Sequence, residues 1–219
     1  MERPEVTDVL QLSLHGNHLA LDLVNTVDWR LAPERPDHVD LLTDDEVLLH
    51  WGHRLGLLDE PELRATVRKL VPGSTEARDR TVALRETLYA IFARVAAHEP
   101  PNERDLEALS AAFSEAIAHA RLRSSGDGTL VWSWDDADPR ERLRWAVAAS
   151  AIDLLTNGEL ARVKQCHDDG CGWVFLDMSK NASRRWCSMQ GCGARAKMRR
   201  QYRRKRGGTQ KGRPAEAAR

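Results

Sequence analysis

The sequence predicts a mainly α protein, in which a helical N-terminal domain with a small β-hairpin precedes a C-terminal module made of a hairpin and a basic helix. Two observations lead to this division. Up to about residue 160, apolar residues recur at intervals of three and four, the period of a helix buried on one face. Beyond that point, all four cysteines and a run of basic residues follow one another. We therefore expect domains at 1–160 and 161–207 and a disordered tail at 208–219.

Local start signals justify the first helices. Asn17 is available as a cap for a helix of about residues 17–29. The sequence TDDE at 43–46 has the form of a capping box, in which a hydroxyl and a carboxylate each satisfy a backbone N–H at the helix start. Pro61 suits the first turn of a short helix over 61–70, because a proline lacks the N–H that would have no partner there.

Stop signals and turn residues predict the helices and the hairpin that follow. Ser74 begins a longer helix that ends before Pro100, and Asn102 caps the next one. The stretch 121–134 alternates in polarity on both sides of a turn rich in Gly, Ser and Asp, which is typical of a hairpin. A last helix occupies about residues 138–158, between an Asp-Pro start and an Asn-Gly stop.

Charge is distributed unevenly along a chain whose formal net charge is zero. Residues 178–213 contain 13 Lys or Arg and no Asp or Glu, whereas residues 1–177 contain 19 basic and 32 acidic residues. This asymmetry predicts that only the C-terminal end binds a polyanion. No apolar run reaches the length of a membrane-spanning helix, and the N-terminus lacks the features of a secretory signal. We expect a cytoplasmic protein that does not contact a membrane.

The cysteines form the pattern C-x4-C-x15-C-x4-C, at Cys166, Cys171, Cys187 and Cys192. In a reducing compartment, two close pairs are more typical of metal ligands than of disulfides. Four thiolates complete a tetrahedral shell around one structural Zn²⁺, although the same ligand set also binds iron. A strand over 173–179 and a return through the turn KNAS complete a hairpin. The module is thus predicted to be a treble-clef or ribbon-like zinc finger.

A helix rich in basic residues is expected from Ala194 to Arg206, directly after the last cysteine. Ala194, Met198 and Tyr202 form a narrow apolar stripe that we expect to dock on the zinc finger. So many like charges on one helix favour a bound polyanion. The predicted nucleic-acid contacts are Arg184, Arg185, Arg195, Lys197, Arg199, Arg200, Arg203 and Arg204.

Four polar residues on and just after the first helix are candidates for a ligand pocket in the N-terminal domain. They are Asp22, Asn25, Thr26 and Arg30, which lie among apolar neighbours. Their ligand would be an unknown small molecule. Capping and surface roles are the alternative for each of them.

At these segments the chain resembles a bacterial family, the CGNR zinc-finger proteins with an N-terminal ABATE domain, described as stress-induced transcription regulators. The matching segments are CGWVFLDMSKNASRRWCSMQGCGARAKMRR in the finger and LALDLVNTVDWR near the N-terminus. The resemblance implies zinc ligation by the four cysteines and nucleic-acid contact through Arg195–Arg200. This chain reads CGAR where the family has CGNR, so Ala194 stands in place of an Asn.

The function that these features predict best is a DNA-binding transcription regulator with an N-terminal sensing domain. RNA binding is the alternative, because ribbon-like zinc modules with nearby aromatic and arginine residues also bind RNA. A protein-interaction role stays open as well, since the basic end could bind the acidic body of a second copy and form an oligomer. The sequence has no phosphate loop, nucleophile motif or open metal site, and we do not expect an enzyme.

Overall fold

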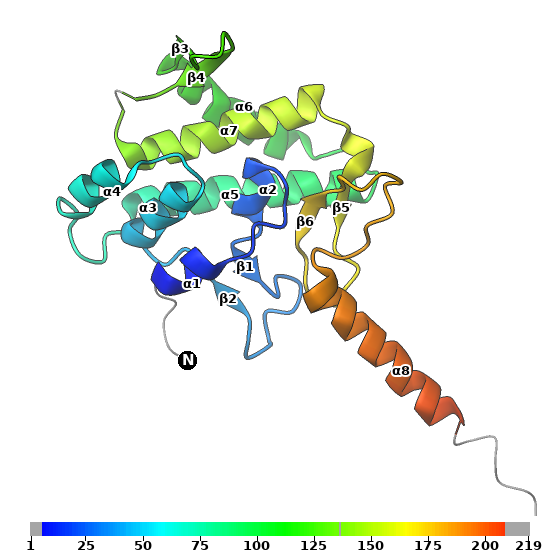
Figure 1. Ribbon diagram of the computed structural model, residues 1–219. Helices are drawn as coiled ribbons and strands as arrows, with labels where there is room; N and C mark the ends of the chain where they lie inside the picture. Colours follow the sequence, from blue (N-terminus) through cyan, green and yellow to red (C-terminus); the bar gives the residue numbers. More distant parts are fainter. Residues whose placement is uncertain (1–5, 136, 209–219) are drawn as a thin grey trace, which may run out of the picture.

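The computed structural model describes residues 6–135 and 137–208, with side chains up to residue 205. As predicted, the protein is mainly helical, and Figure 1 shows a body of helices from which α8 projects. The tail predicted beyond residue 208 and the side chain of Arg206 lie outside the described part. The helices are α1 (Val6–Gln11), α2 (Leu19–Val24), α3 (Asp45–Arg54), α4 (Glu60–Val67), α5 (Glu76–Ala96), α6 (Glu103–Ala118), α7 (Pro139–Asn157) and α8 (Ala194–Gly208), and the strands are β1 (Val27–Asp28), β2 (Val39–Asp40), β3 (Arg121–Ser124), β4 (Leu130–Ser133), β5 (Val163–Gln165) and β6 (Val174–Leu176).

Side-chain caps start helices close to the positions that the sequence indicated. Asp138 caps α7 by accepting the backbone N–H of Arg140 at 2.9 Å. The capping box at 43–46 differs from the expectation, because Asp44 and not the threonine accepts the N–H of Val47, at 2.9 Å. The helix α3 therefore begins at Asp45, within two residues of the predicted start.

The first long helix predicted is shorter in the structure. α2 ends at Val24 instead of near residue 29, because Asn25 leaves the helix and the two-residue strand β1 follows. Trp29 has a positive φ of 52°, which is uncommon for a bulky residue and turns the chain sharply. The segment after α2 therefore forms a strand and a tight loop instead of two further helical turns.

The hairpin predicted between residues 121 and 134 is confirmed. It consists of the antiparallel strands β3 and β4, in which Leu122 lies opposite Trp132. Trp134, just after β4, is buried and donates its indole N–H to the carbonyl oxygen of Ala116 at 2.7 Å. Trp145 of α7 belongs to the same small apolar cluster, which fixes the hairpin to α6 and α7.

One hydrophobic core extends from the N-terminal helices into the C-terminal module. Leu88, Ile91 and Phe92 of the central helix α5 are fully buried in it. Phe175 of β6 is also fully buried and belongs to the same cluster. Both β5 and β6 pack on α5. The C-terminal module therefore shares its apolar interior with the helical domain, and the predicted boundary near residue 160 separates two segments of one core.

The strand pairing of the C-terminal module differs from the prediction. β6 pairs with β5, the strand that precedes the first cysteine, and Gln165 lies opposite Val174. The expected partner at 184–186 is not a strand. The hairpin loop between β5 and β6 thus contains the first cysteine pair, because that pair folds the chain back on itself. Among the described residues, no helix has the length and apolar character needed to cross a membrane.

Candidate zinc centre and nucleic-acid interface

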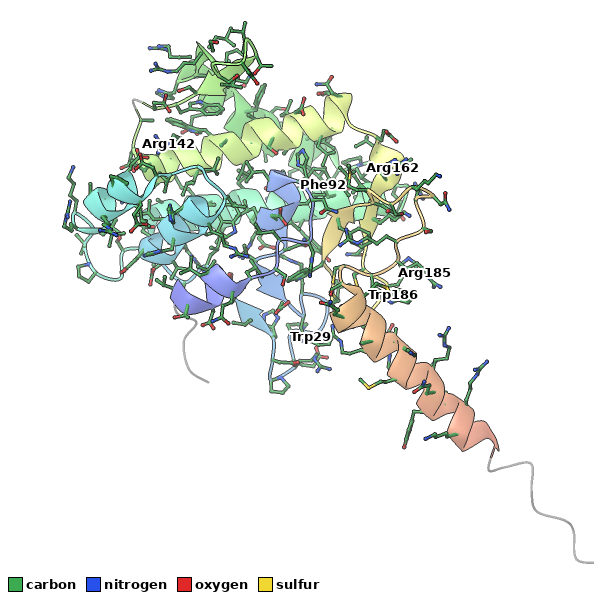
Figure 2. The ribbon with its side chains drawn as sticks, viewed as in Figure 1. Trp29, Phe92, Arg142, Arg162, Arg185 and Trp186 are labelled. Atoms are coloured by element: carbon green, nitrogen blue, oxygen red, sulfur yellow. The ribbon has the colours of Figure 1, made fainter. Side chains whose placement is uncertain are left out.

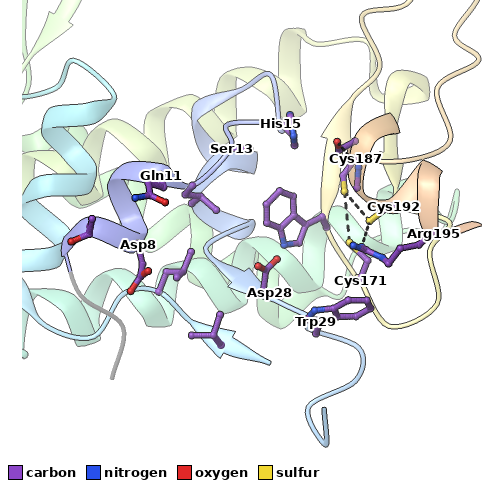
Figure 3. Close-up of a pocket in the computed structure, with 17 residues that line it drawn as sticks. Asp8, Gln11, Ser13, His15, Asp28, Trp29, Cys171, Cys187, Cys192 and Arg195 are labelled. Carbon is purple, nitrogen blue, oxygen red and sulfur yellow. Dashed lines mark hydrogen bonds between the residues drawn. The ribbon is translucent and has the colours of Figure 1, made fainter. Parts of the chain in front are cut away.

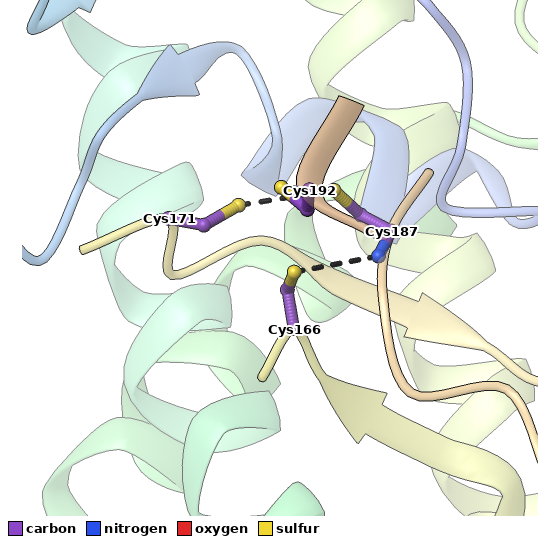
Figure 4. A group of neighbouring side chains, drawn as sticks. All are labelled: Cys166, Cys171, Cys187 and Cys192. Carbon is purple, nitrogen blue, oxygen red and sulfur yellow. Dashed lines mark hydrogen bonds between the residues drawn. The ribbon is translucent and has the colours of Figure 1, made fainter. Parts of the chain in front are cut away.

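The four cysteines converge on one point although they come from two separate segments (Figure 4). Cys166 and Cys171 lie in the loop between β5 and β6, and Cys187 and Cys192 lie just before α8. All four are buried, and their sulfur atoms lie within 4.8 Å of one another. The predicted meeting of the two pairs is therefore found in the structure.

The spacing of the sulfur atoms fits a tetrahedral zinc ion. The Sγ atoms of Cys171 and Cys187 are 3.8 Å apart, and those of Cys187 and Cys192 are 3.4 Å apart. A tetrahedron with Zn–S bonds of about 2.3 Å has S···S edges of about 3.8 Å, whereas a disulfide would bring two sulfurs to about 2.05 Å. All four cysteines are free. The finger thus holds one structural zinc, and four protein ligands leave that ion no position for a substrate.

The first cysteine pair packs closely on residues 29–32 of the helical domain, which we call the docking loop. The backbone N–H groups of Arg30 and Leu31 donate to the carbonyl oxygens of Cys171 and Gly170, at 3.2 and 3.1 Å. Gly170 has a φ of +86°, and a Cβ built on it would lie 2.9 Å from the Cβ of Ala32. A side chain at this glycine would therefore both strain the backbone and separate the two surfaces.

Asn25 joins the helical domain to strand β6. Its amide nitrogen donates to the carbonyl oxygen of Val174 at 2.8 Å, and its amide oxygen accepts the N–H of the same residue at 2.9 Å. The neighbouring indole N–H of Trp173 donates to the carbonyl oxygen of Val27 at 2.9 Å. Asn25 is 1% exposed. Water therefore cannot bind its amide or the backbone of Val174, and the two hydrogen bonds between them satisfy these polar groups.

In the structure, all four residues of the predicted ligand pocket are hydrogen-bonded or ion-paired to other parts of the fold. Besides Asn25, Asp22 accepts the backbone N–H of Gly16 at 2.8 Å. The hydroxyl of Thr26 donates to a carbonyl oxygen of α2 and accepts a hydrogen bond from buried Arg85. Arg30 forms an ion pair with Glu86 and lies over the ring of Tyr89. These polar residues hold α2, α5 and the finger together.

Burial raises the pKa of Asp22 to about 6, against the opposing effects of the Gly16 hydrogen bond and the charge of Arg54. The folded protein therefore binds a proton at Asp22 more tightly than the unfolded chain does, and stability falls as pH rises from about 4 to about 6. This loss amounts to about 3 kcal/mol. We expect the variant Asp22→Asn to lose this part of the pH dependence in urea unfolding measured between pH 4 and 7.

A matched control for this titration is Glu107→Gln, which removes an exposed acid on α6. It should leave the pH dependence as in the wild type. If Asp22→Asn and the wild type lose the same stability between pH 4 and 6, the buried carboxyl of Asp22 is not the group that titrates.

Asp168, which lies between the cysteines of the first pair, binds two arginines of α8. Its buried carboxylate accepts hydrogen bonds from Arg195 Nε at 2.8 Å and Arg199 Nη2 at 2.5 Å. Arg195 also donates to the sulfur of Cys192 at 2.8 Å and lies over the ring of Trp29. Burial alone would lower the pKa of Arg195, because it disfavours the charged guanidinium. The hydrogen bond to Asp168 favours the charged form, and the pKa of Arg195 is raised overall. These contacts set the direction in which α8 leaves the finger.

Arg184 and Arg185 were both predicted to contact nucleic acid, and the structure places them differently. The guanidinium of Arg184 lies over the ring of Phe175 and donates to the carbonyl oxygens of His15 and Cys187, at 2.9 and 2.5 Å. Burial lowers its pKa. Arg185 is exposed, and Figure 2 shows it on the outside of the finger. Of the two, only Arg185 is accessible to a partner.

The remaining predicted cations form the outward surface of α8. Arg195 and Arg199 face Asp168, and the helical period puts Lys197, Arg200 and Arg204 on the opposite side. Those three and Arg203 are exposed and have no acidic partner among the described residues. We call these four residues the outward cations.

The prediction that an apolar stripe docks α8 on the finger is wrong. Met198 and Tyr202 are each 62% exposed, because α8 points away from the body after its first turns (Figure 1). The ion pairs of Arg195 and Arg199 hold the helix instead. Sequence reasoning missed Asp168, although an acid between two cysteines, in a segment that precedes a long basic run, was a usable signal.

Ala194 occupies the position at which the resembled family has an Asn. It is the first residue of α8 and has helical dihedral angles, with φ −65° and ψ −44°. The turn before it is stabilised by the hydroxyl of Ser188, which accepts the N–H of Gly191 at 3.2 Å. The helix therefore starts here without a cap from residue 194.

Two family models match the chain. Residues 17–158 match ABATE, which is described as "Putative stress-induced transcription regulator", and residues 162–205 match the CGNR zinc finger. No curated protein matches the chain. The two matched segments meet where Asn25 binds Val174 of β6 and where the docking loop contacts the first cysteine pair.

Proposed function

This chain belongs to the ABATE family and ends in a CGNR zinc finger, and we propose that it is a cytoplasmic transcription regulator that binds DNA through α8. In this proposal the zinc finger supplies the binding surface and the helical domain senses a small molecule. The zinc ion is structural in the proposal, because four buried thiolates leave the metal no open position. The proposal assigns the protein no enzymatic activity.

The observation that carries the proposal is the separation of charges on α8. Arg195 and Arg199 are bound to Asp168, while the outward cations face solvent on a helix that projects from the body. A single α-helix fits the major groove of duplex DNA. The helical domain is acidic and would be repelled by phosphates, which favours an approach in which only α8 meets the duplex.

The salt dependence of duplex binding tests this surface. Four outward cations predict a slope of log K against log salt of about −4. Replacing Lys197, Arg200 and Arg204 by alanine should reduce the slope to about −1 and weaken binding by about a hundredfold at 0.1 M salt. Fluorescence anisotropy with a labelled duplex at several KCl concentrations measures both quantities.

A second triple variant controls for net charge. Arg68, Lys69 and Arg104 are exposed cations of the helical domain, and their replacement by alanine removes the same charge. It should leave binding nearly unchanged. Equal weakening by the two triple variants would reject α8 as the binding surface.

RNA is the second candidate, and the exposure of Tyr202 favours it, because an exposed aromatic ring on a basic helix can stack on an unpaired base. Competition of duplex DNA against structured and single-stranded RNA at one salt concentration separates the two. We expect the duplex to compete best.

A further inference from the structure

A cavity of about 940 Å³ lies where α1, β1 and the zinc finger meet (Figure 3). Its size lies within the range of sites for small organic molecules. Three of the four zinc ligands contribute to its wall, and so does Arg195. None of the residues predicted from the sequence as a ligand pocket lines it.

The wall combines flat apolar surface with the carboxylate of Asp28. Trp173 and Leu41 contribute apolar surface. The ring of Trp29 also lines the cavity, but it lies under the guanidinium groups of Arg35 and Arg195. Figure 3 shows Asp28 in the cavity between α1 and Trp29. The carboxylate of Asp28 accepts no hydrogen bond from any described residue, and burial raises its pKa against the opposing effect of the charge of Arg195. A bound donor group would therefore satisfy Asp28.

The electrostatic field of the cavity favours a positive ligand. Asp28 lines it, and four thiolates around one divalent ion carry an excess of negative charge. Among the described residues that line the cavity, Arg195 is the one Lys or Arg, and it is ion-paired with Asp168. An anionic ligand would meet these negative groups and, in the described part of the wall, a cation that is already paired with Asp168.

We propose that this cavity binds a small planar organic cation, whose flat body contacts Trp173 and whose donor group binds the carboxylate of Asp28, next to Trp29. The proposal rests on the proposed function, because it assigns the sensing role of the helical domain to this site. Arg195 gives the site a direct connection to the nucleic-acid surface, since it lines the cavity and also holds α8 through Asp168.

Benzamidine, a planar cation, is the probe for this site. It is titrated into the zinc-loaded full-length chain without nucleic acid, and the NMR signals of the indole N–H groups are followed. We expect saturable shifts of the Trp29 and Trp173 signals, and an affinity about tenfold weaker in Asp28→Asn. The matched control Glu34→Gln, an exposed acid outside the cavity wall, should bind benzamidine as the wild type does.

Benzoate, which has nearly the same shape and the opposite charge, tests the preference on the unmodified protein. It should give no saturable shift of either indole signal. Equal binding of benzoate, unchanged affinity in Asp28→Asn, or shifts that do not saturate with benzamidine would each overturn the site. The benzamidine titration contains no nucleic acid, so its result does not depend on DNA binding. A separate titration in which the protein fails to bind DNA would reject the proposed function without changing a positive benzamidine result.

Discussion

Removal of the zinc ion is expected to unfold the whole chain, not the finger alone. Phe175 and all four cysteines belong to the same buried cluster as Leu88 and Phe92 of α5. Zinc contributes about 10 to 16 kcal/mol to the folding of isolated finger peptides, which is comparable to the total stability of about 5 to 15 kcal/mol of an ordinary domain. Loss of the ion also releases Asp168, which lies between the cysteines of the first pair, and the docking loop, which is hydrogen-bonded to Gly170 and Cys171.

Circular dichroism during heating, with and without a chelator, measures this effect. We expect the unfolding temperature of the helical signal to fall by about 20 °C or more, and excess Zn²⁺ to restore it. The substitution Cys187→Ser, which removes one ligand, should give the same loss without a chelator. An unchanged transition of the helical domain in the metal-free protein would contradict the shared core.

The variant Asn25→Ala is expected to lose about 4 kcal/mol of stability. It leaves both backbone polar groups of Val174 buried without a partner, and each such group costs about 1 to 3 kcal/mol. Urea unfolding with the zinc-loaded protein measures the loss as a lower midpoint at nearly constant slope.

The control for this variant is Asn157→Ala at the end of α7. Its side chain is exposed and donates to Asp153 at 2.9 Å, so its removal should change stability by about 0.5 kcal/mol or less. Similar losses in the two variants would mean that the bonds of Asn25 to strand β6 do not hold the finger on the helical domain.

The features predicted from the sequence are those that local rules determine. The caps and prolines located most of the helices, and the equal spacing of the cysteine pairs indicated the metal centre before any contact was known. The charge pattern identified α8 as a distinct basic element. In each case the signal and the structure that it produces lie within a few residues of one another.

The features that were missed depend on contacts between distant segments. Asn25 reads as a polar residue on a helix, and its partner Val174 is 149 residues away. Similarly, nothing local distinguishes Arg195 and Arg199, which bind Asp168, from Arg200 and the other outward cations. Strand β6 pairs with β5 and not with residues 184–186, because the first cysteine pair fixes the hairpin loop between β5 and β6.

The central claim is that the zinc centre and Asp168 present one face of α8 to nucleic acid. An NMR titration of the zinc-loaded, isotopically labelled chain with a short DNA duplex tests it most directly. The predicted result is that backbone signals change along residues 197–205, while those of Asp168 and of the hairpin β3–β4 stay in place. Changes concentrated on the helical domain, with residues 197–205 unaffected at low salt, would contradict the claim.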